Sequence, residues 1–185
     1  QVSLKTLFSC VTASLKELQK VLYGGKRFGN HVDEVWPNLY IGNMAVAQNK
    51  AVLLNLGITH VLNAAHSKQG SPGNQSFYGN DFVYFGIPAD DSTHFDLDVY
   101  FQPAADFIHK ALKSPGKVLV HCIMGMSRSS TLVLAYLMIY HHLPLKQALQ
   151  KVVQKRAIYP NRNFLALLLD LDLQLTRKKK TCQIL

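Results

Sequence analysis

Three residues that could serve one reaction together occur within the nine residues "HCIMGMSRS" (121–129). Cys122 carries a thiol, which is a nucleophile once ionised. Arg128 carries a planar guanidinium that can pair with two oxygens of one phosphate. Gly125 lies between them and permits a tight turn with a close approach of the backbone to a ligand. The segment is therefore a candidate site at which a thiolate faces a bound phosphate.

The flanking segments predict how this loop is held. "KVLVHC" (117–122) is a continuous apolar run, typical of a strand buried in a parallel sheet, and residues 129–141 predict a helix. The N-terminus of a helix supplies convergent N–H groups and a partial positive charge to an anion. Such a cradle favours the thiolate form of Cys122. We expect an activated nucleophile at the base of a phosphate-binding loop.

Each of these residues also has an ordinary structural interpretation. A cysteine after a buried strand commonly packs in the core, a loop glycine commonly serves a turn, and an arginine at a helix start commonly lies on the surface. The whole pattern H-C-x-x-G-x-x-R would arise by chance in roughly one of a thousand chains of this length. Its strand–loop–helix setting favours the functional interpretation further.

The remaining elements predict an α/β fold. Apolar patterns indicate strands at 34–42, 58–65, 82–89 and 117–122 and helices around 44–57 and at 99–114, 129–141, 144–156 and about 161–176. Their alternation favours a central, mostly parallel, twisted sheet with helices on both faces. "LALLLDLDLQL" (165–175) also shows the alternation of a strand, but Pro160-Asn161 is a good helix start, so we expect a helix there.

The chain of 185 residues, 48% of them hydrophobic, predicts one catalytic domain over 28–176. Before it, residues 1–27 contain a predicted helix, because Ser14 and Glu17 form a capping-box pattern and Gly24-Gly25 ends the apolar periodicity. After it, residues 177–185 are expected to form a basic tail.

The formal net charge of +9 is compatible with anionic partners or with a solvated basic surface. Much of the excess lies in "TRKKK" (176–180), with no interleaved aromatic residues, so nucleic acid is not the expected partner. Phosphorylated substrates account for the charge more simply. No apolar run is long enough to span a bilayer.

The cysteines and histidines indicate the setting. Cys10, Cys122 and Cys182 are few and scattered, so no disulfide framework is expected, and "QVSLKTLFSC" (1–10) lacks a signal-peptide pattern. A cytoplasmic and possibly nuclear location follows. The eight histidines lack zinc-site spacings, and we expect neither a metal nor another cofactor.

"HCIMGMSRSS" with "AYLM" (135–138) resembles the dual-specificity branch of the cysteine-dependent protein phosphatases. The resemblance runs from about His31 to Leu175 and includes "HVDEVWPNLYIG", "LGITHVLNAAH" and "GIPADDSTHFDL". The order and spacing are similar to small atypical members, which lack a preceding targeting domain, and especially to the muscle and testis group. Outside the catalytic loop, three positions differ from the residues usual in the family: Asn43 for Asp, Asn163 for Gly and Leu167 for Gln. These differences put local packing or partner choice in doubt more than the chemistry.

The resemblance implies a mechanism. Cys122 attacks phosphorus to form a cysteinyl-phosphate, while Arg128 and the loop N–H groups hold the phosphate oxygens. Ser129 stabilises the departing thiolate in the second step, and His121 orients the loop. The substrate-binding residues are expected to be those of the loop itself: Ile123, Met124, Gly125, Met126, Ser127 and Arg128.

A carboxylic acid must protonate the leaving oxygen and then activate water. "PADDSTHF" (88–95) offers Asp90 and Asp91, and neighbours in an extended loop point in different directions, so only one can reach the leaving group. The resemblance matches Asp91 to the acid.

The variable loop positions carry no cation, which favours one phosphate on an apolar or aromatic carrier over a phosphoinositide. By resemblance, the short domain has a shallow pocket that accepts phosphotyrosine and phosphoserine/threonine. A phosphoprotein-binding module or scaffold with little turnover is the alternative, and the intact Cys122, Arg128 and acid candidates disfavour it.

Cys182-Gln-Ile-Leu fits a prenylation pattern beside four cations at 177–180. Gln is not aliphatic, however, and the similar family members are generally not lipidated. Membrane association through Cys182 is therefore the less favoured expectation, and a disordered basic tail the favoured one. The sequence does not determine the oligomeric state.

Overall fold

The structure is a computed structural model that describes residues 13–25 and 29–184. The expectations for Cys10 and for the first ten residues lie outside these ranges. The described elements alternate between strands and helices along the chain: α1 Leu15–Tyr23, β1 Val32–Trp36, β2 Leu39–Gly42, α2 Met44–Ala47, α3 Lys50–Leu56, β3 His60–Asn63, α4 Gln75–Tyr78, β4 Val83–Gly86, the 3₁₀ helix η2 Leu97–Tyr100, α5 Phe101–Lys113, β5 Val118–His121, α6 Arg128–Tyr140, α7 Leu145–Val153 and α8 Arg162–Ile184.

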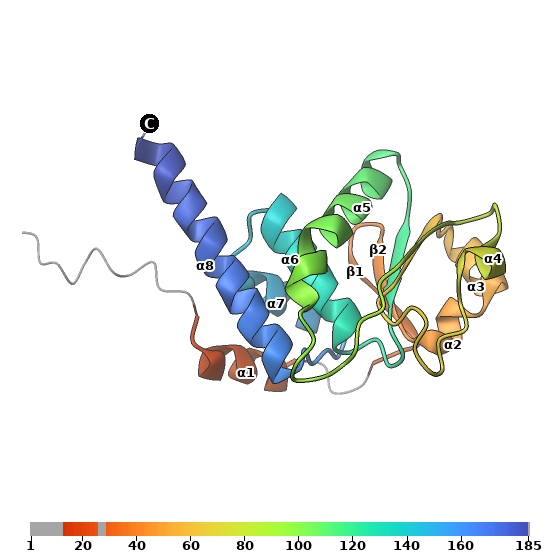
Figure 1. Cartoon of the computed structure of the whole chain (residues 1–185), viewed down its shortest axis with the longest axis horizontal. Coiled ribbons are helices and arrows are strands. Elements are labelled where there is room, and N and C mark those ends of the chain that lie inside the picture. Colours follow the sequence, from red (N-terminus) through yellow and green to blue (C-terminus); the bar gives the residue numbers. More distant parts are fainter. Residues whose placement is uncertain (1–12, 26–28, 185) are drawn as a thin grey trace, which may run out of the picture.

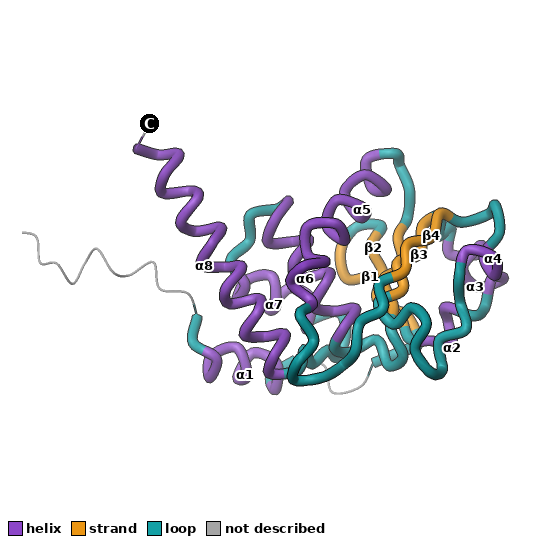
Figure 2. The backbone as a smooth tube through the Cα atoms, in the orientation of Figure 1, coloured by secondary structure: helices purple, strands orange, loops and turns teal. Residues whose placement is uncertain are grey.

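The strands form one five-stranded sheet in the order β1-β2-β5-β3-β4. Only the β1–β2 pair is antiparallel, and the other three pairs are parallel. Helices α2, α3 and α4 cover one face, while α5, α6, α7 and α8 lie on the other (Figures 1 and 2). The predicted α/β architecture with a mostly parallel sheet and helices on both faces is confirmed.

The central strand β5 shows why its sequence is continuously apolar. Val118 and Val120 join the large core under α5 and α6, while Leu119 joins the smaller core under α2 and α3. Successive side chains of a strand point to opposite faces, so a strand covered on both faces places apolar residues in both cores. The last residue of β5, His121, is the polar exception and is also buried.

The predicted single strand at 34–42 is wrong. It is a hairpin, in which β1 and β2 are joined at Pro37-Asn38 and Trp36 pairs with Leu39. Asn38 has φ +63°, a left-handed conformation that asparagine tolerates in turns. The apolar pattern continues across the turn and hides it, although Pro37-Asn38 was the available signal.

The capping-box prediction for the N-terminal helix is confirmed. The Ser14 hydroxyl accepts a hydrogen bond from the Glu17 N–H at 3.3 Å, and the Glu17 carboxylate accepts one from the Ser14 N–H at 3.1 Å. The predicted helix around 44–57 divides into α2 and α3, because the side chain of Asn49 accepts from the Val52 N–H and starts a new helix.

Residues 165–175 are helical, as predicted, but the predicted helix end near 176 and the disordered tail are wrong. Helix α8 continues through the basic residues to Ile184, and its C-terminal end extends beyond the rest of the domain (Figure 1). Lysine and arginine are good helix formers, and positive charge is favourable towards a helix C-terminus. Lys179 also donates a hydrogen bond to the His142 carbonyl at 3.2 Å.

Within the described ranges, no helix combines the length and the apolar character that crossing a membrane requires.

Candidate active site

The loop that begins at Cys122 lies at the carboxyl edge of the sheet centre. The last residue of β5, His121, pairs with Gly42 of β2 on one side and with Asn63 of β3 on the other. The neighbouring β4 ends at Gly86 and leads into the segment that contains Asp90 and Asp91. The parallel arrangement therefore brings the phosphate loop and the acid candidates to one edge, where α/β folds commonly bind ligands.

Cys122 lies at the base of the loop with 2% of its surface exposed. Its Sγ accepts a hydrogen bond from the Gly125 N–H at 3.2 Å and lies 3.3 Å from Ser129 Oγ. One backbone N–H and one hydroxyl group therefore lie within hydrogen-bond distance of this sulfur.

Gly125 is required by the backbone. Its φ of +67° is left-handed, and a Cβ built there would lie 2.5 Å from the Gly42 carbonyl oxygen and 2.6 Å from an Arg156 nitrogen. No other residue type avoids these contacts, so the turn that aims the Gly125 N–H at sulfur depends on glycine.

Arg128 is the first residue of α6 and is 91% buried, with 9% of its surface exposed. Its Nη1 donates to the Ala89 carbonyl at 3.0 Å, whereas its Nε has no hydrogen-bond partner within the described residues. Buried guanidinium N–H groups normally have partners. The free Nε–H is thus available to an anion in the loop.

His121 is fully buried directly before the nucleophile. Its Nδ1 lies 3.3 Å from the Cys122 carbonyl oxygen. Burial, with a smaller effect of the Arg128 charge, lowers the pKa of His121 from 6.5 to about 4, although its hydrogen bond to that carbonyl acts in the other direction. The imidazole is therefore neutral near pH 7 and is placed to hold the backbone.

The two acid candidates have different partners. Asp90 forms an ion pair with Lys68 at 2.8 Å on the surface. Asp91 reaches the phosphate loop instead, where its Oδ1 accepts from Ser127 Oγ and from Asn161 Nδ2, each at 2.8 Å. Both bonds end on Oδ1, so Oδ2 is the oxygen that can face a leaving group.

Arg156 supports the loop from behind, a role that the sequence analysis missed. It is 2% exposed, and its guanidinium donates to the carbonyls of Gly125 at 2.9 Å and Met124 at 3.4 Å. It also donates to the Asn30 carbonyl at 2.6 Å and forms an ion pair with Asp33 of β1 at 2.8 Å. Because the loop carbonyls point outward to Arg156, the loop N–H groups can point inward.

A signal for Arg156 was present in the sequence. The apolar face of α7 includes Ala148 and Val152, and Arg156 follows Val152 by four positions on the same face. A charged residue on the buried face of a helix is expected to be buried as well, and a buried charge needs a partner of opposite charge or hydrogen-bond acceptors.

Asn161 joins three parts of the site, although the sequence indicated only a helix start. Its backbone N–H donates to Ser127 Oγ at 3.0 Å, and its side-chain Nδ2 donates to Asp91. Its Oδ1 accepts from the Phe164 N–H at 2.8 Å and caps α8. The helix start therefore also locates the acid candidate.

The side chains of the loop form an apolar rim. Met124 and Met126 are 66% and 38% exposed, while Ile123 is partly buried and Ser127 is buried. A pocket of about 520 Å³ adjoins the rim, and its lining consists of Gly29, Asn30, His31, Asn43, Met124, Met126, Arg156 and Ala157. Over residues 13–25 and 29–184, no three His, Cys, Asp or Glu side chains are grouped so that they could hold a metal ion.

Two of the three departures from the family pattern now have a local explanation. Asn43 caps α2 by accepting from the Val46 N–H at 3.2 Å, as an aspartate there could, and its Nδ2 lies 2.8 Å from His31 Nδ1. Asn163 contacts the segment that follows Asp91. Leu167 helps to line a small pocket between α5 and α8.

The fold and the loop define a class of enzyme. Residues 39–174 match the family described as "Dual specificity phosphatase, catalytic domain". The chain therefore belongs to the dual-specificity phosphatases, and it is a protein phosphatase of the small, atypical kind.

Particular relatives agree with this assignment. The chain is 55% identical over 161 residues to dual specificity protein phosphatase 26 of Homo sapiens, across 86% of this chain and 75% of the relative. The structure of human DUSP28 matches with a TM-score of 0.72 and 25% identity, over 80% of this chain and 97% of that one. A mouse putative dual specificity phosphatase complexed with zinc tungstate matches with a TM-score of 0.73 and 28% identity, over 83% and 94% of the two chains.

Proposed function

We propose that this phosphatase hydrolyses phosphotyrosine and phosphoserine/threonine in proteins through a cysteinyl-phosphate on Cys122. The observation that carries the proposal is the position of its Sγ, which lies 3.2 Å from the Gly125 nitrogen at the base of a loop that opens α6. The sulfur attacks phosphorus, a P–S bond forms, and the P–O bond to the substrate breaks.

Arg128 and the loop N–H groups hold the non-bridging phosphate oxygens. The buried guanidinium keeps an unpartnered Nε–H, and the N-terminus of α6 adds its N–H groups. Charge-assisted hydrogen bonds of this kind contribute about 1.5–3 kcal/mol each. They favour the transition state most, because charge is then distributed over these oxygens.

Asp91 is the general acid in the first step and the general base in the second. Its Oδ1 is bound to Ser127 and Asn161, so the carboxyl group is held at the rim of the loop with Oδ2 outward. Oδ2 gives a proton to the leaving oxygen and later takes one from the attacking water. Asp90 takes no part, because it is paired with Lys68.

In the second step, water attacks phosphorus, the P–S bond breaks, and Cys122 leaves as a thiolate. Ser129 Oγ, 3.3 Å from Sγ, donates a hydrogen bond to that thiolate. His121 is neutral and holds the Cys122 carbonyl rather than transferring protons.

The rim explains the breadth of the proposed substrates. Ile123, Met124 and Met126 offer apolar contacts and no cation, which suits one phosphate on an aromatic or aliphatic carrier. A thiolate nucleophile also needs a reducing environment, so we propose a cytoplasmic and possibly nuclear location.

The test is direct detection of the intermediate. Reactions with para-nitrophenyl phosphate are quenched rapidly, and the mass of the peptide that contains Cys122 is measured by mass spectrometry. We expect one added phosphoryl group in the wild type, more of it in Ser129→Ala, and neither the group nor turnover in Cys122→Ser. Activity should survive EDTA. Substantial turnover by Cys122→Ser would refute the proposal, and a wild type that binds phosphopeptides without turnover would favour a scaffold.

A further inference from the structure

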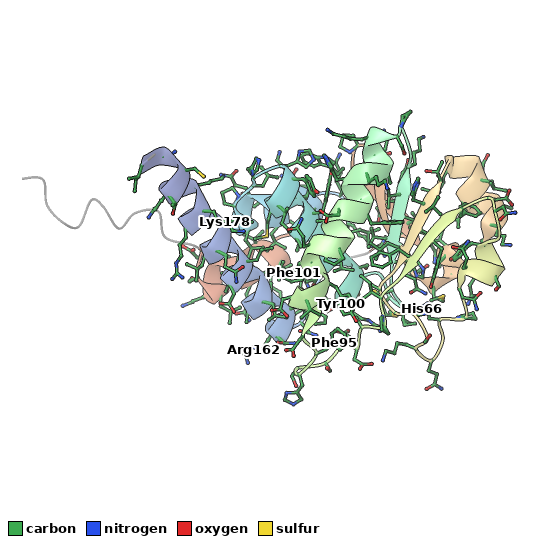
Figure 3. The ribbon with its side chains drawn as sticks, turned by 45° about the horizontal axis from the view of Figure 1, so that its top comes forward. His66, Phe95, Tyr100, Phe101, Arg162 and Lys178 are labelled. Atoms are coloured by element: carbon green, nitrogen blue, oxygen red, sulfur yellow. The ribbon has the colours of Figure 1, made fainter. Side chains whose placement is uncertain are left out.

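The first turn of α8 binds the segment that follows Asp91, here called the acid loop (residues 91–95). Asn163 Nδ2 donates to the Phe95 carbonyl at 2.9 Å and lies 3.3 Å from the Ser92 carbonyl oxygen, to which it also donates. Phe95 of the acid loop and Arg162 at the start of α8 mark the two joined segments in Figure 3. One amide group therefore holds both ends of a four-residue stretch.

Two other contacts hold the acid loop beside that of Asn163. Asn161 Nδ2 donates to Asp91 Oδ1 and also to the Ser92 carbonyl at 3.2 Å. Phe95 is further held by stacking on Tyr100, with the two rings within 7° of parallel (Figure 3). Asn161 thus binds the carboxylate of Asp91, and Asn163 binds backbone carbonyls of the residues that follow Asp91.

The residue type at 163 matters because the contact needs an N–H donor on a side chain. A glycine at this position would have no side chain and could make neither bond. Asn163 is partly buried, so its bonds to the two carbonyls are shielded from competing water. Asn163 therefore gives the acid loop an anchor that a glycine at this position could not supply.

We propose that Asn163 is a positioning residue, which fixes the acid loop to the first turn of α8 and so holds Asp91 in reach of the leaving group. The inference rests on the proposed role of Asp91 as general acid. It predicts that loss of the Asn163 donor impairs proton transfer selectively. Substrates that need a proton on the leaving group should suffer, whereas substrates with a stable leaving anion should not.

The variant that separates this role from helix stability is Asn163→Asp. The side chain keeps its shape, and a negative charge in the first turn of a helix is favourable. The donor is lost, however, and a carboxylate oxygen faces two carbonyl oxygens. The favourable charge at the helix start offsets part of the lost hydrogen bonds, so we expect a folded protein with a small decrease in thermal midpoint and a displaced acid loop.

The assay compares para-nitrophenyl phosphate, which has a good leaving group, with phenyl phosphate, which has a poor one. For Asn163→Asp we expect kcat to fall about tenfold on phenyl phosphate and less than about twofold on para-nitrophenyl phosphate, a partial form of general-acid loss. The basic limb of the pH–rate profile should also become flatter. Asn163→Ala, which loses the donor without repulsion, should change in the same direction by less.

The matched control is Asn49→Asp, which is also an asparagine-to-aspartate change at the start of a helix. Asn49 caps α3 through the Val52 N–H at 3.2 Å and does not contact the acid loop. Its ratio of activities on the two substrates should equal that of the wild type.

The outcomes distinguish the two levels of the proposal. Suppose that Asp91→Ala loses kcat selectively on phenyl phosphate. If Asn163→Asp then loses kcat equally on both substrates, or does not change, the positioning role of Asn163 is overturned. If Asp91→Ala shows no preference between the substrates, the proposed general acid itself is wrong. Selective loss in both variants supports both.

Discussion

The contact of Arg156 with the back of the phosphate loop leads to a quantitative prediction. Arg156→Met keeps most of the side-chain length and removes all of its polar bonds. Asp33, whose side chain is 12% exposed, then loses its cation, and the carbonyls of Met124 and Gly125 lose their donor. Breaking a buried ion pair by removing one partner costs about 3–5 kcal/mol.

That loss is a large part of the total stability of a domain, which is about 5–15 kcal/mol. We therefore expect Arg156→Met to remain folded at 25 °C with a much lower urea midpoint. The loop N–H groups would then lose their fixed direction towards the phosphate. We therefore expect kcat/KM on para-nitrophenyl phosphate to fall about 10²-fold, which is the loss expected when binding groups are displaced by about 1 Å.

Two further variants separate the effect of the Arg156 contacts from a general loss of positive charge or stability. Lys155→Met is the matched control, because the neighbouring cation is exposed, and both stability and activity should stay near wild type. In Arg156→Met with Asp33→Asn, the unpaired buried charge is gone, so part of the stability should return without the activity. If the double variant recovers full activity, or if Arg156→Met keeps at least half of it, the loop does not depend on these carbonyl contacts.

Three other predictions concern the acid candidates and the buried titratable groups. Asp91→Ala should lower kcat on phenyl phosphate by about 10²–10⁴ and Asp90→Ala by little, and the reverse order would exchange their roles. Because burial lowers the pKa of His121 to about 4, the unfolded chain binds more protons between about pH 6.5 and 4, and the free energy of unfolding should fall by up to about 3 kcal/mol as pH drops through that window. Urea titrations of His121→Gln should show a smaller slope over this window, because only the contribution of His121 is removed while those of His60 and His141 remain. Burial raises the pKa of Asp172, so its stabilising contribution is lost as pH rises through the folded-state value. Asp172→Asn should therefore raise the thermal midpoint at neutral pH and have little effect in acid, and equal shifts at both would contradict this reasoning.

Local patterns were sufficient for much of the fold. The apolar run of β5 and the apolar face of α7 report the burial of their own residues, since burial follows directly from side-chain periodicity. The capping box of α1 is local in another way, because its two hydrogen bonds join residues three positions apart. The same patterns failed at Pro37-Asn38, where the alternation continues through a turn, and at the end of α8. There, charged residues without an apolar face still form helix because their propensity is high.

The sequence by itself determined the strand–loop–helix unit in which Cys122, Gly125 and Arg128 lie, because these seven consecutive residues need only local geometry to form one turn between β5 and α6. Only the tertiary structure decided which residues complete the site. Asp90 and Asp91 are adjacent in the chain and differ only through distant partners, Lys68 for one and Asn161 for the other. Contacts between segments that are far apart in the chain depend on how the sheet and helices pack, and no local pattern records them.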